Sequence, residues 1–327
     1  ISLLAGGLAF FFTTFVFFFH LFPGFPVRYL WIAAALVPVM LFYMLGVNLL
    51  VGINRIKTFN FFEITNRLAG LIGLVIAALI LGGVGEFLLA VFLAALLPVI
   101  ALFGWLYRRY GEGLRFRRTL FTEGFQYAFK AYLVALLGFL TTQANILLLR
   151  QLSGSVEVGY YSIGYNIWNA LAVLPTSVAL VLFPRLVRTE EHRREITLAN
   201  TAIVGGIMLA ICLVTSFLAR PLIEILFGGE FLPALPVLYW MLPGIFFSSM
   251  VNILSQYLAA IGFPGLLIGI WAAGFLMVLG LGYFLIPINQ SVGAAISASA
   301  TWVFLFMMHL GMVCKDQDKQ MSVKLST

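Results

Sequence analysis

Long apolar runs follow one another along almost the entire chain. A helix needs roughly 20 apolar residues to cross a bilayer, and ten runs of about that length are separated only by glycine, proline or charged clusters. They do not show the alternation typical of membrane-barrel strands. The sequence therefore predicts an all-α polytopic membrane protein of about ten transmembrane helices. These lie near residues 1–22, 29–52, 61–83, 85–107, 122–149, 157–182, 198–219, 233–260, 264–287 and 290–313.

The composition leaves little of the 327 residues for a soluble domain. The chain is 62% hydrophobic and 9% charged, whereas soluble proteins carry about 25% charged residues. The net charge of +7 forms no basic stripe apart from the apolar runs, so we expect no nucleic-acid partner. Cys212 and Cys314 lie far apart without metal-ligand spacing, and catalytic motifs are absent. We therefore expect neither an enzyme nor a bound metal or other cofactor.

The basic residues gather on one side of the predicted helices. Lysine and arginine accumulate in short cytoplasmic connections. Of the 19 basic residues, only Arg28, Arg150 and Arg220 fall on the opposite side. We therefore expect a multi-pass protein of the cytoplasmic (inner) membrane with its C-terminus in the cytoplasm.

A weak internal repeat predicts how the helices are grouped. When the chain is compared with itself, Val84 and Gly85 align with Val292 and Gly293, and the second to fourth runs superpose on the eighth to tenth. Transporters often contain such duplicated units. The repeat predicts an incomplete N-terminal lobe of four spans (1–118), a C-terminal lobe of six spans (119–313) and a cytoplasmic tail (314–327). On this count the first two helices of the N-terminal lobe are lacking.

Polar side chains form stripes on three predicted helices. A charge at the centre of a bilayer costs about 2.5–3.5 kcal/mol on insertion scales, so such residues usually face a partner or a watery cavity. On each helix the stripe falls within roughly 100° of the circumference. The stripes contain Glu123, Gln126, Lys130, Thr141 and Asn145; Ser162, Asn166, Asn169 and Ser177; and Ser248, Asn252, Ser255 and Gln256.

Two interpretations of these stripes remain open. Serine, threonine and asparagine commonly link packed membrane helices for about 0.6 kcal/mol each, or the stripes line a shared polar cavity. Lys130 either faces that cavity or snorkels to the headgroups. Arg67 follows Glu63 by four residues, which favours an intrahelical ion pair. We expect Trp168 and Trp240 to face the core or lipid rather than a sugar ring.

Four segments resemble a known family of membrane proteins. Residues 158–186, "VGYYSIGYNIWNALAVLPTSVALVLFPRL", residues 220–244, "RPLIEILFGGEFLPALPVLYWMLPG", and the pair "LAAIGFP" and "VGAAISASATWVF" are similar to the Wzx-type polysaccharide biosynthesis flippases. These belong to the MATE/MOP-like superfamily, which also holds lipid II flippases and multidrug extruders. The resemblance covers roughly residues 120–313 and implies two six-helix lobes.

The resemblance implies transport of an undecaprenyl-pyrophosphate-linked oligosaccharide across the membrane by alternating access, for surface polysaccharides such as O-antigen. The implied partners are this substrate, membrane lipids, a polysaccharide polymerase and glycosyltransferases, with H⁺ or Na⁺ as a candidate coupling ion. Lys130 and Arg67 would attract the phosphates, and amides would contact sugar. The candidate cavity residues are Arg67, Gln126, Lys130, Asn145, Asn166, Asn169, Asn252 and Gln256. A multidrug or cation antiporter of the same fold is the alternative, and a membrane-bound glycan polymerase a weaker one.

Overall fold

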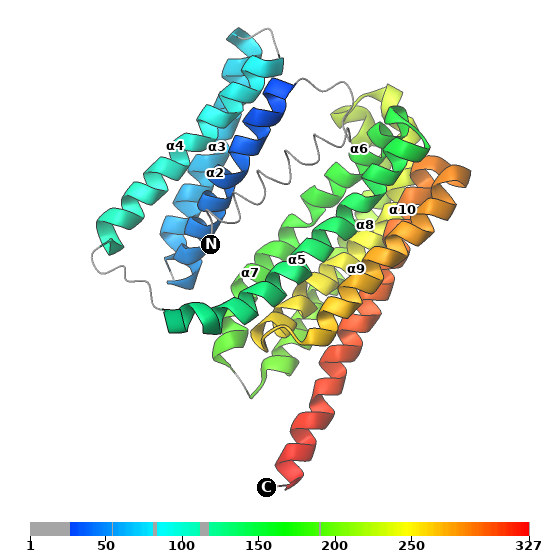
Figure 1. The fold of residues 1–327 in the computed structure, drawn as a ribbon. Helices are drawn as coiled ribbons and strands as arrows, with labels where there is room; N and C mark the ends of the chain where they lie inside the picture. Colours follow the sequence, from blue (N-terminus) through cyan, green and yellow to red (C-terminus); the bar gives the residue numbers. More distant parts are fainter. Residues whose placement is uncertain (1–26, 54, 81–83, 112–117, 190, 327) are drawn as a thin grey trace. The chain divides into compact units, whose positions relative to one another are not determined.

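The computed structural model describes residues 27–53, 55–80, 84–111, 118–189 and 191–326 (Figure 1). All regular structure in these ranges is helical, which confirms the predicted fold class. Six of the described helices are long and apolar enough to cross a bilayer, and a bent pair makes a seventh. The predicted span at 1–22 lies outside the described residues. The chain divides into two units, Ile1–Phe116 (unit 1) and Arg117–Thr327 (unit 2).

Unit 1 contains three described helices, α2 (Val27–Gly52), α3 (Ile56–Ile80) and α4 (Val84–Tyr110). A small core holds them together, in which Tyr43 and Leu50 of α2 meet Phe62 of α3 and Leu102 of α4. The Tyr43 hydroxyl donates a hydrogen bond of 2.8 Å to the carbonyl of Phe62. The polar end of this buried ring is therefore satisfied by the neighbouring helix, as burial requires.

Unit 2 contains α5 (Arg118–Leu152), α6 (Ser155–Leu171), α7 (Val173–Arg188), α8 (Arg193–Leu226), the short 3-10 helix η1 (Gly229–Ala234), α9 (Leu235–Ala260) and α10 (Gly265–Ser326). The α9 helix contacts α6, α7, α8 and α10. Its apolar span is 61% buried, against 22–33% for the other unbroken spans of unit 2. We conclude that α9 forms the centre of this unit.

The predicted spans at 264–287 and 290–313 are the two halves of α10, which meet at a non-helical break at Gln290 (φ 50°, ψ −128°). The Glu157 carboxylate of α6 accepts hydrogen bonds from the Ser291 N–H (3.2 Å) and hydroxyl (2.5 Å). These bonds satisfy donors that the start of the second half would otherwise leave free. A Cβ at Gly293 would lie 2.2 Å from the Leu285 carbonyl oxygen, so only glycine fits where the two halves meet.

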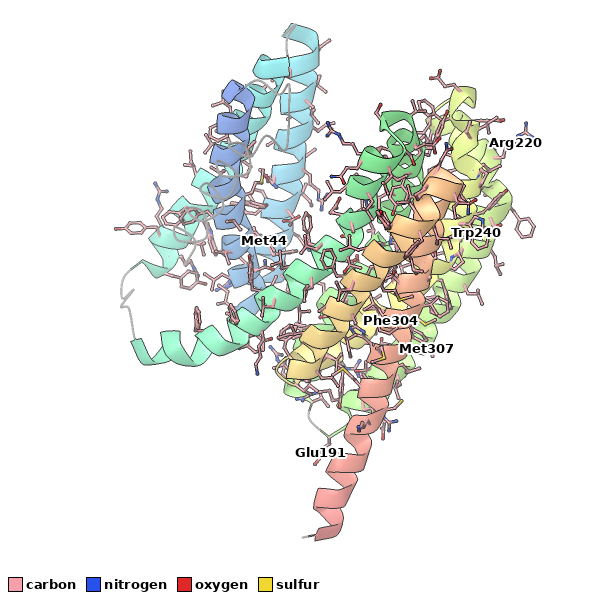
Figure 2. The ribbon with its side chains drawn as sticks, turned by 45° about the vertical axis from the view of Figure 1, so that its right-hand side comes forward. Met44, Glu191, Arg220, Trp240, Phe304 and Met307 are labelled. Carbon is pink, nitrogen blue, oxygen red and sulfur yellow. The ribbon has the colours of Figure 1, made fainter. Side chains whose placement is uncertain are left out.

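The outside of the helices is apolar and several buried contacts are polar. Met44 of unit 1 and Trp240 and Met307 of unit 2 are 61%, 50% and 59% exposed (Figure 2). In contrast, Ser299 is buried: its hydroxyl donates to the Trp240 carbonyl (2.5 Å) and accepts from the Gly244 N–H (3.0 Å). This distribution is the one expected of a protein whose surface faces lipid and whose buried polar groups are paired.

Candidate functional site: a polar pocket in unit 2

A polar pocket lies between α5, α6 and the second half of α10. Its cavity volume is about 80 Å³, room for a few water molecules. Side chains at helical spacing on each element point into it, because residues three or four apart share a helix face. The lining residues are Thr141, Thr142 and Asn145 of α5, Tyr161, Tyr165, Trp168, Asn169 and Ala172 of α6 and its end, and Ala298 and Trp302 of α10.

Asn145 is the most deeply buried amide of the pocket, at 1% exposure. Its Nδ2 donates to the Ala294 carbonyl at 3.1 Å, which fixes the orientation of the amide. Its Oδ1 lies against Gly282, where a Cβ would approach it to 3.1 Å. That oxygen has no hydrogen-bond partner within the described residues. Asn145 therefore links α5 to both halves of α10 and keeps one acceptor unused.

The rest of the pocket offers hydroxyl groups and aromatic faces. The Tyr165 oxygen accepts from Gln143 Nε2 at 3.3 Å, which leaves its own O–H able to donate. The Thr141 hydroxyl donates to the Leu137 carbonyl (2.7 Å), so its oxygen can still accept. Trp168 and Trp302 stand with ring centroids 6.1 Å apart at 51°. The pocket thus presents neutral hydrogen-bonding groups beside flat apolar surfaces.

The other predicted amides whose side chains are described do not all lie at this pocket. Asn169 lines the same pocket and is exposed, and Asn166 is exposed as well. Asn252 of α9 instead donates from Nδ2 to the Thr176 hydroxyl of α7 at 3.2 Å, and Gln256 donates to the Asn252 carbonyl at 3.3 Å. Neither of these two lines the pocket. The stripes of α6 and α9 therefore converge only in part.

Several stripe hydroxyls bond within their own helix. Ser162 donates to the Val158 carbonyl at 2.7 Å, and Ser177 does the same with Val173. Ser248 donates to the Ile245 carbonyl at 2.9 Å. The bonds that these three serines donate therefore stay within one helix, because a hydroxyl in a helix can reach the carbonyl three or four residues earlier.

Lys130 is half-buried on α5, one turn inside the apolar span that begins at Tyr127. Its depth allows the ammonium group to reach the headgroup level along its flexible stem. The backbone of Gln126 belongs to α5, but its side chain lies outside the described residues, as does that of Glu123.

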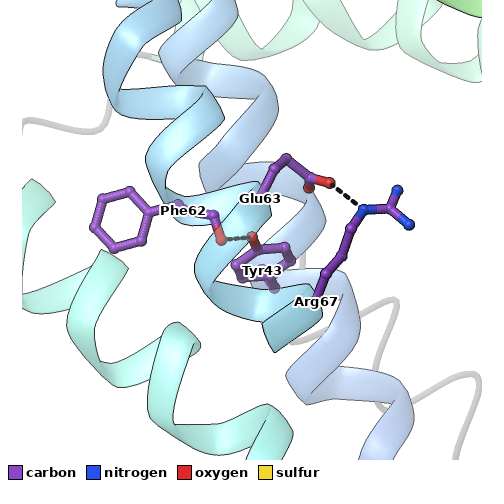
Figure 3. Close-up of polar contacts among 4 residues, drawn as sticks. All are labelled: Tyr43, Phe62, Glu63 and Arg67. Carbon is purple, nitrogen blue, oxygen red and sulfur yellow. Dashed lines mark hydrogen bonds and ion pairs between the residues drawn. The ribbon is translucent and has the colours of Figure 1, made fainter. Parts of the chain in front are cut away.

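Arg67 belongs to unit 1. Its Nε lies 3.7 Å from Glu63 Oε2, which confirms the predicted intrahelical ion pair (Figure 3). The Arg67 side chain is 82% exposed, so the pair contributes little to stability. Tyr43 lies beside it and is held by Phe62. The guanidinium is therefore accessible to a ligand.

Of the residues that line the pocket, only Asn145 and Asn169 belong to the predicted cavity set, and the aromatic residues Tyr161, Tyr165 and Trp302 are among those that the sequence did not single out. The four-residue spacing of Tyr161 and Tyr165 was a usable signal, but in a chain with 15% aromatic residues it does not stand out. Trp168 is 8% exposed, as expected for a core residue, and it also lines the pocket. Within the described residues, acidic, histidine and cysteine side chains form no cluster that could hold a metal ion.

A family model for polysaccharide biosynthesis proteins matches residues 1–236. The chain belongs to the polysaccharide biosynthesis protein family. No match was found among curated protein sequences. The resemblance noted for the C-terminal half is thereby confirmed at the level of the family.

Solved structures show the same fold as this polysaccharide biosynthesis protein. The lipid II flippase MurJ, in an inward-closed conformation, matches with a TM-score of 0.73 at 13% identity, over 96% of this chain and 69% of its own. An outward-facing multidrug-resistance MATE transporter of the MOP superfamily matches with a TM-score of 0.73 at 15% identity, over 97% of this chain and 77% of its own. A Vibrio cholerae MATE transporter, VcmN, matches with a TM-score of 0.69 at 16% identity, over 97% of this chain and 78% of its own. The chain is a multi-pass membrane protein with a MATE/MOP-like fold.

Proposed function

We propose that this protein is a flippase that carries an undecaprenyl-pyrophosphate-linked oligosaccharide across the cytoplasmic membrane by alternating access. The family match carries the proposal, because the family is named for polysaccharide biosynthesis and the fold is shared with a lipid flippase and with transporters. Glycans assembled on a lipid carrier must cross the bilayer before they reach the cell surface. The charge distribution supports a cytoplasmic C-terminus.

The chemistry of the polar pocket supports a glycan more than a cation. Sugar hydroxyls pair with amides and hydroxyls, and the Trp168 and Trp302 faces suit the apolar side of a sugar ring. A cation or proton antiporter would need an acidic ligand at such a site. None of the residues that line the pocket is a carboxylate. The cavity is small, so we propose that it receives one edge of a sugar rather than a complete residue.

The basic side chains have separate roles in the proposal. Lys130 and Arg67 attract the pyrophosphate, and Arg67 can exchange its exposed carboxylate partner for a phosphate. Asn145, Asn166, Asn169, Asn252, Gln256 and Gln126 contact sugar hydroxyls. A gradient of H⁺ or Na⁺ gives the transport its direction. The transport step makes and breaks no covalent bond. Glycosyltransferases supply its substrate on one side of the membrane, and a polymerase consumes that substrate after transport.

Leaflet exchange of a labelled lipid-linked oligosaccharide in proteoliposomes tests the proposal. The oligosaccharide is placed in one leaflet, and its arrival in the other is measured with a lectin or a glycosidase that cannot cross the membrane. We expect exchange faster than in protein-free liposomes. The absence of exchange, together with drug efflux under an ion gradient, would overturn the proposal in favour of an antiporter.

A pair of basic residues on α5 supplies a matched control. Replacing Lys130 by Ala should slow exchange about tenfold, because a hydrogen bond to a charged group contributes about 1.5 kcal/mol. Arg150, exposed at the other end of the same helix, should tolerate Ala without a change in rate. If the Lys130 and Arg150 variants exchange the oligosaccharide at the same rate, Lys130 only snorkels to the headgroups and has no role in transport.

A further inference from the structure

The size of the polar pocket in unit 2 limits what part of a sugar can enter it. Its volume of about 80 Å³ holds a few water molecules. A side group of a few atoms therefore fits, and a complete sugar ring does not. Which side group fits best follows from the charge, the free hydrogen-bonding atoms and the apolar surfaces of the lining.

The lining of the pocket carries no charge. None of the described residues that line it is acidic or basic. An ion placed there would lose its hydration without gaining a counter-charge, which is costly away from water. The pocket therefore excludes the carboxylate of an acidic sugar and the ammonium of an amino sugar.

The hydroxyl groups of the lining determine which hydrogen bonds an occupant can make. The Tyr165 oxygen accepts from Gln143 Nε2 at 3.3 Å, so the Tyr165 O–H is left to donate. Thr141 is 3% exposed, and its hydroxyl already donates to the Leu137 carbonyl, so its oxygen is left to accept. Thr142 likewise donates within its own helix. An occupant must therefore offer an acceptor to Tyr165 and a donor to a threonine.

The remaining wall of the pocket is apolar. The rings of Trp168 and Trp302 meet at 51° with their centroids 6.1 Å apart, and Ala172 and Ala298 complete this wall. Trp302 also packs edge-to-face against Trp271, at a centroid distance of 5.9 Å, which holds its ring in place. A small apolar group placed against these rings leaves water and gains dispersion contacts.

The side groups that sugars carry differ in how well they meet these three conditions. A hydroxyl has a donor and an acceptor but no apolar part, and the methyl group of a deoxy sugar has neither donor nor acceptor. An O-acetyl ester has no donor. An acetamido group is neutral and has one N–H, one C=O and one methyl group, so it meets all three conditions.

We propose that the polar pocket is a subsite for the acetamido group of an N-acetylhexosamine. The acetamido N–H donates to Thr141 or Thr142, the acetamido carbonyl accepts from Tyr165, and the methyl group lies against Trp168 and Trp302. The inference rests on the proposed function, because it names a sugar within the transported oligosaccharide.

Binding of two matched sugars to the purified protein tests the inference without transport. The methyl glycosides of N-acetylglucosamine and glucose differ only in the acetamido group, and saturation-transfer NMR in micelles detects weak binding of each. We expect the N-acetylglucosamine glycoside to bind about tenfold more tightly, which corresponds to about 1.4 kcal/mol. Its acetamido methyl protons should receive the most saturation. Binding without this preference, or no binding of either glycoside, would overturn the inference.

Two alanines near the end of α6 separate the pocket from the outer surface of that helix. Ala172→Leu should fill the pocket and lower binding of the N-acetylglucosamine glycoside about tenfold or more. Ala170→Leu, at an exposed position that does not line the pocket, should leave binding unchanged. Equal binding by the two variants would refute the location of the subsite.

A pair of tyrosines tests the hydrogen bond to the acetamido carbonyl, also in case Ala172→Leu does not fold. Tyr165→Phe removes one hydroxyl and should reduce the preference for N-acetylglucosamine about tenfold, since a site that loses such a partner loses discrimination. Tyr160→Phe, at a half-buried position of the same helix outside the pocket, should keep the preference. An undiminished preference in Tyr165→Phe would rule out that hydrogen bond and the proposed orientation of the group.

Leaflet exchange distinguishes a failure of this inference from a failure of the proposed function. Undecaprenyl pyrophosphate linked to N-acetylglucosamine should exchange about tenfold faster than the same lipid linked to glucose. If both exchange at equal rates, the flippase function stands and the subsite is wrong. If neither exchanges although the N-acetylglucosamine glycoside binds as expected, the subsite stands and the proposed function is wrong.

Discussion

The polar pocket and an apolar groove between α8, α9 and α10 use the same ridge of α10 and have opposite chemistry. Ala298 and Trp302 line the pocket, and Phe306 and Leu310 line the groove. These four residues are spaced by four, and each step of four turns the ridge by about 40°. Over three steps it turns by about 120°, from the α5 and α6 side to the α8 and α9 side.

The difference between the two hollows therefore comes from the partner helices. Toward the pocket, α5 and α6 contribute Asn145, Tyr161 and Tyr165; toward the groove, α8 contributes Gly205 and Gly206. The α10 ridge contributes apolar side chains to both. We conclude that a polar pocket and an apolar groove can share one helix, provided that each faces a different neighbour.

The substitution with the largest expected effect, Gly293→Leu, should disturb both the polar pocket and the apolar groove. In Gly293→Leu the new side chain would start 2.2 Å from the Leu285 carbonyl oxygen, and a backbone atom cannot turn aside. We expect a loss of about 3 kcal/mol in the free energy of unfolding, measured by chemical denaturation in micelles. The control Gly280→Ala, in open space within a helix, should be neutral or stabilising by up to about 1 kcal/mol. Equal stability of the two variants would contradict the close contact.

Removing the Asn145 amide should affect the polar pocket. Asn145→Leu deletes the 3.1 Å hydrogen bond to Ala294 and fills polar space with an apolar side chain. We expect about 1–2 kcal/mol of destabilisation and slower leaflet exchange of the lipid-linked oligosaccharide. Exchange at the unaltered rate would show that the Asn145 amide has only a structural role.

Ser299→Ala should have a smaller effect, on the contact between α9 and α10. The variant loses the hydrogen bond to the Trp240 carbonyl and leaves the Gly244 N–H without its present acceptor. Hydrogen bonds between membrane helices average about 0.6 kcal/mol, so we expect a loss of about 1 kcal/mol in denaturation experiments. Thr301→Ala, whose hydroxyl bonds within its own helix, is the control and should change stability less.

The sequence predicted the helices better than it predicted their meeting points. Apolar runs located the spans because any lipid-exposed backbone must be helical. The bend at Ala172, inside the predicted span 157–182, follows from Pro175, which cannot donate to the Leu171 carbonyl and so weakens the helix there. Helical phase placed Asn145 and Asn169 on polar faces, but it contains no information on which neighbour each face meets. For that reason Asn252 was grouped with them, whereas it contacts Thr176.

The smallest expected effect comes from two threonines that differ only in their surroundings. Thr141 and Thr201 are 3% and 6% exposed, and each donates to a carbonyl of its own helix, at 2.7 and 2.8 Å. Replacement by Val should change the stability of either by less than about 0.5 kcal/mol, since such bonds contribute little. Thr141→Val should nevertheless slow leaflet exchange a few-fold, because the pocket loses an acceptor for sugar hydroxyls, while Thr201→Val should leave exchange unchanged. If both variants transport equally well, the hydroxyl in the pocket has only a structural role.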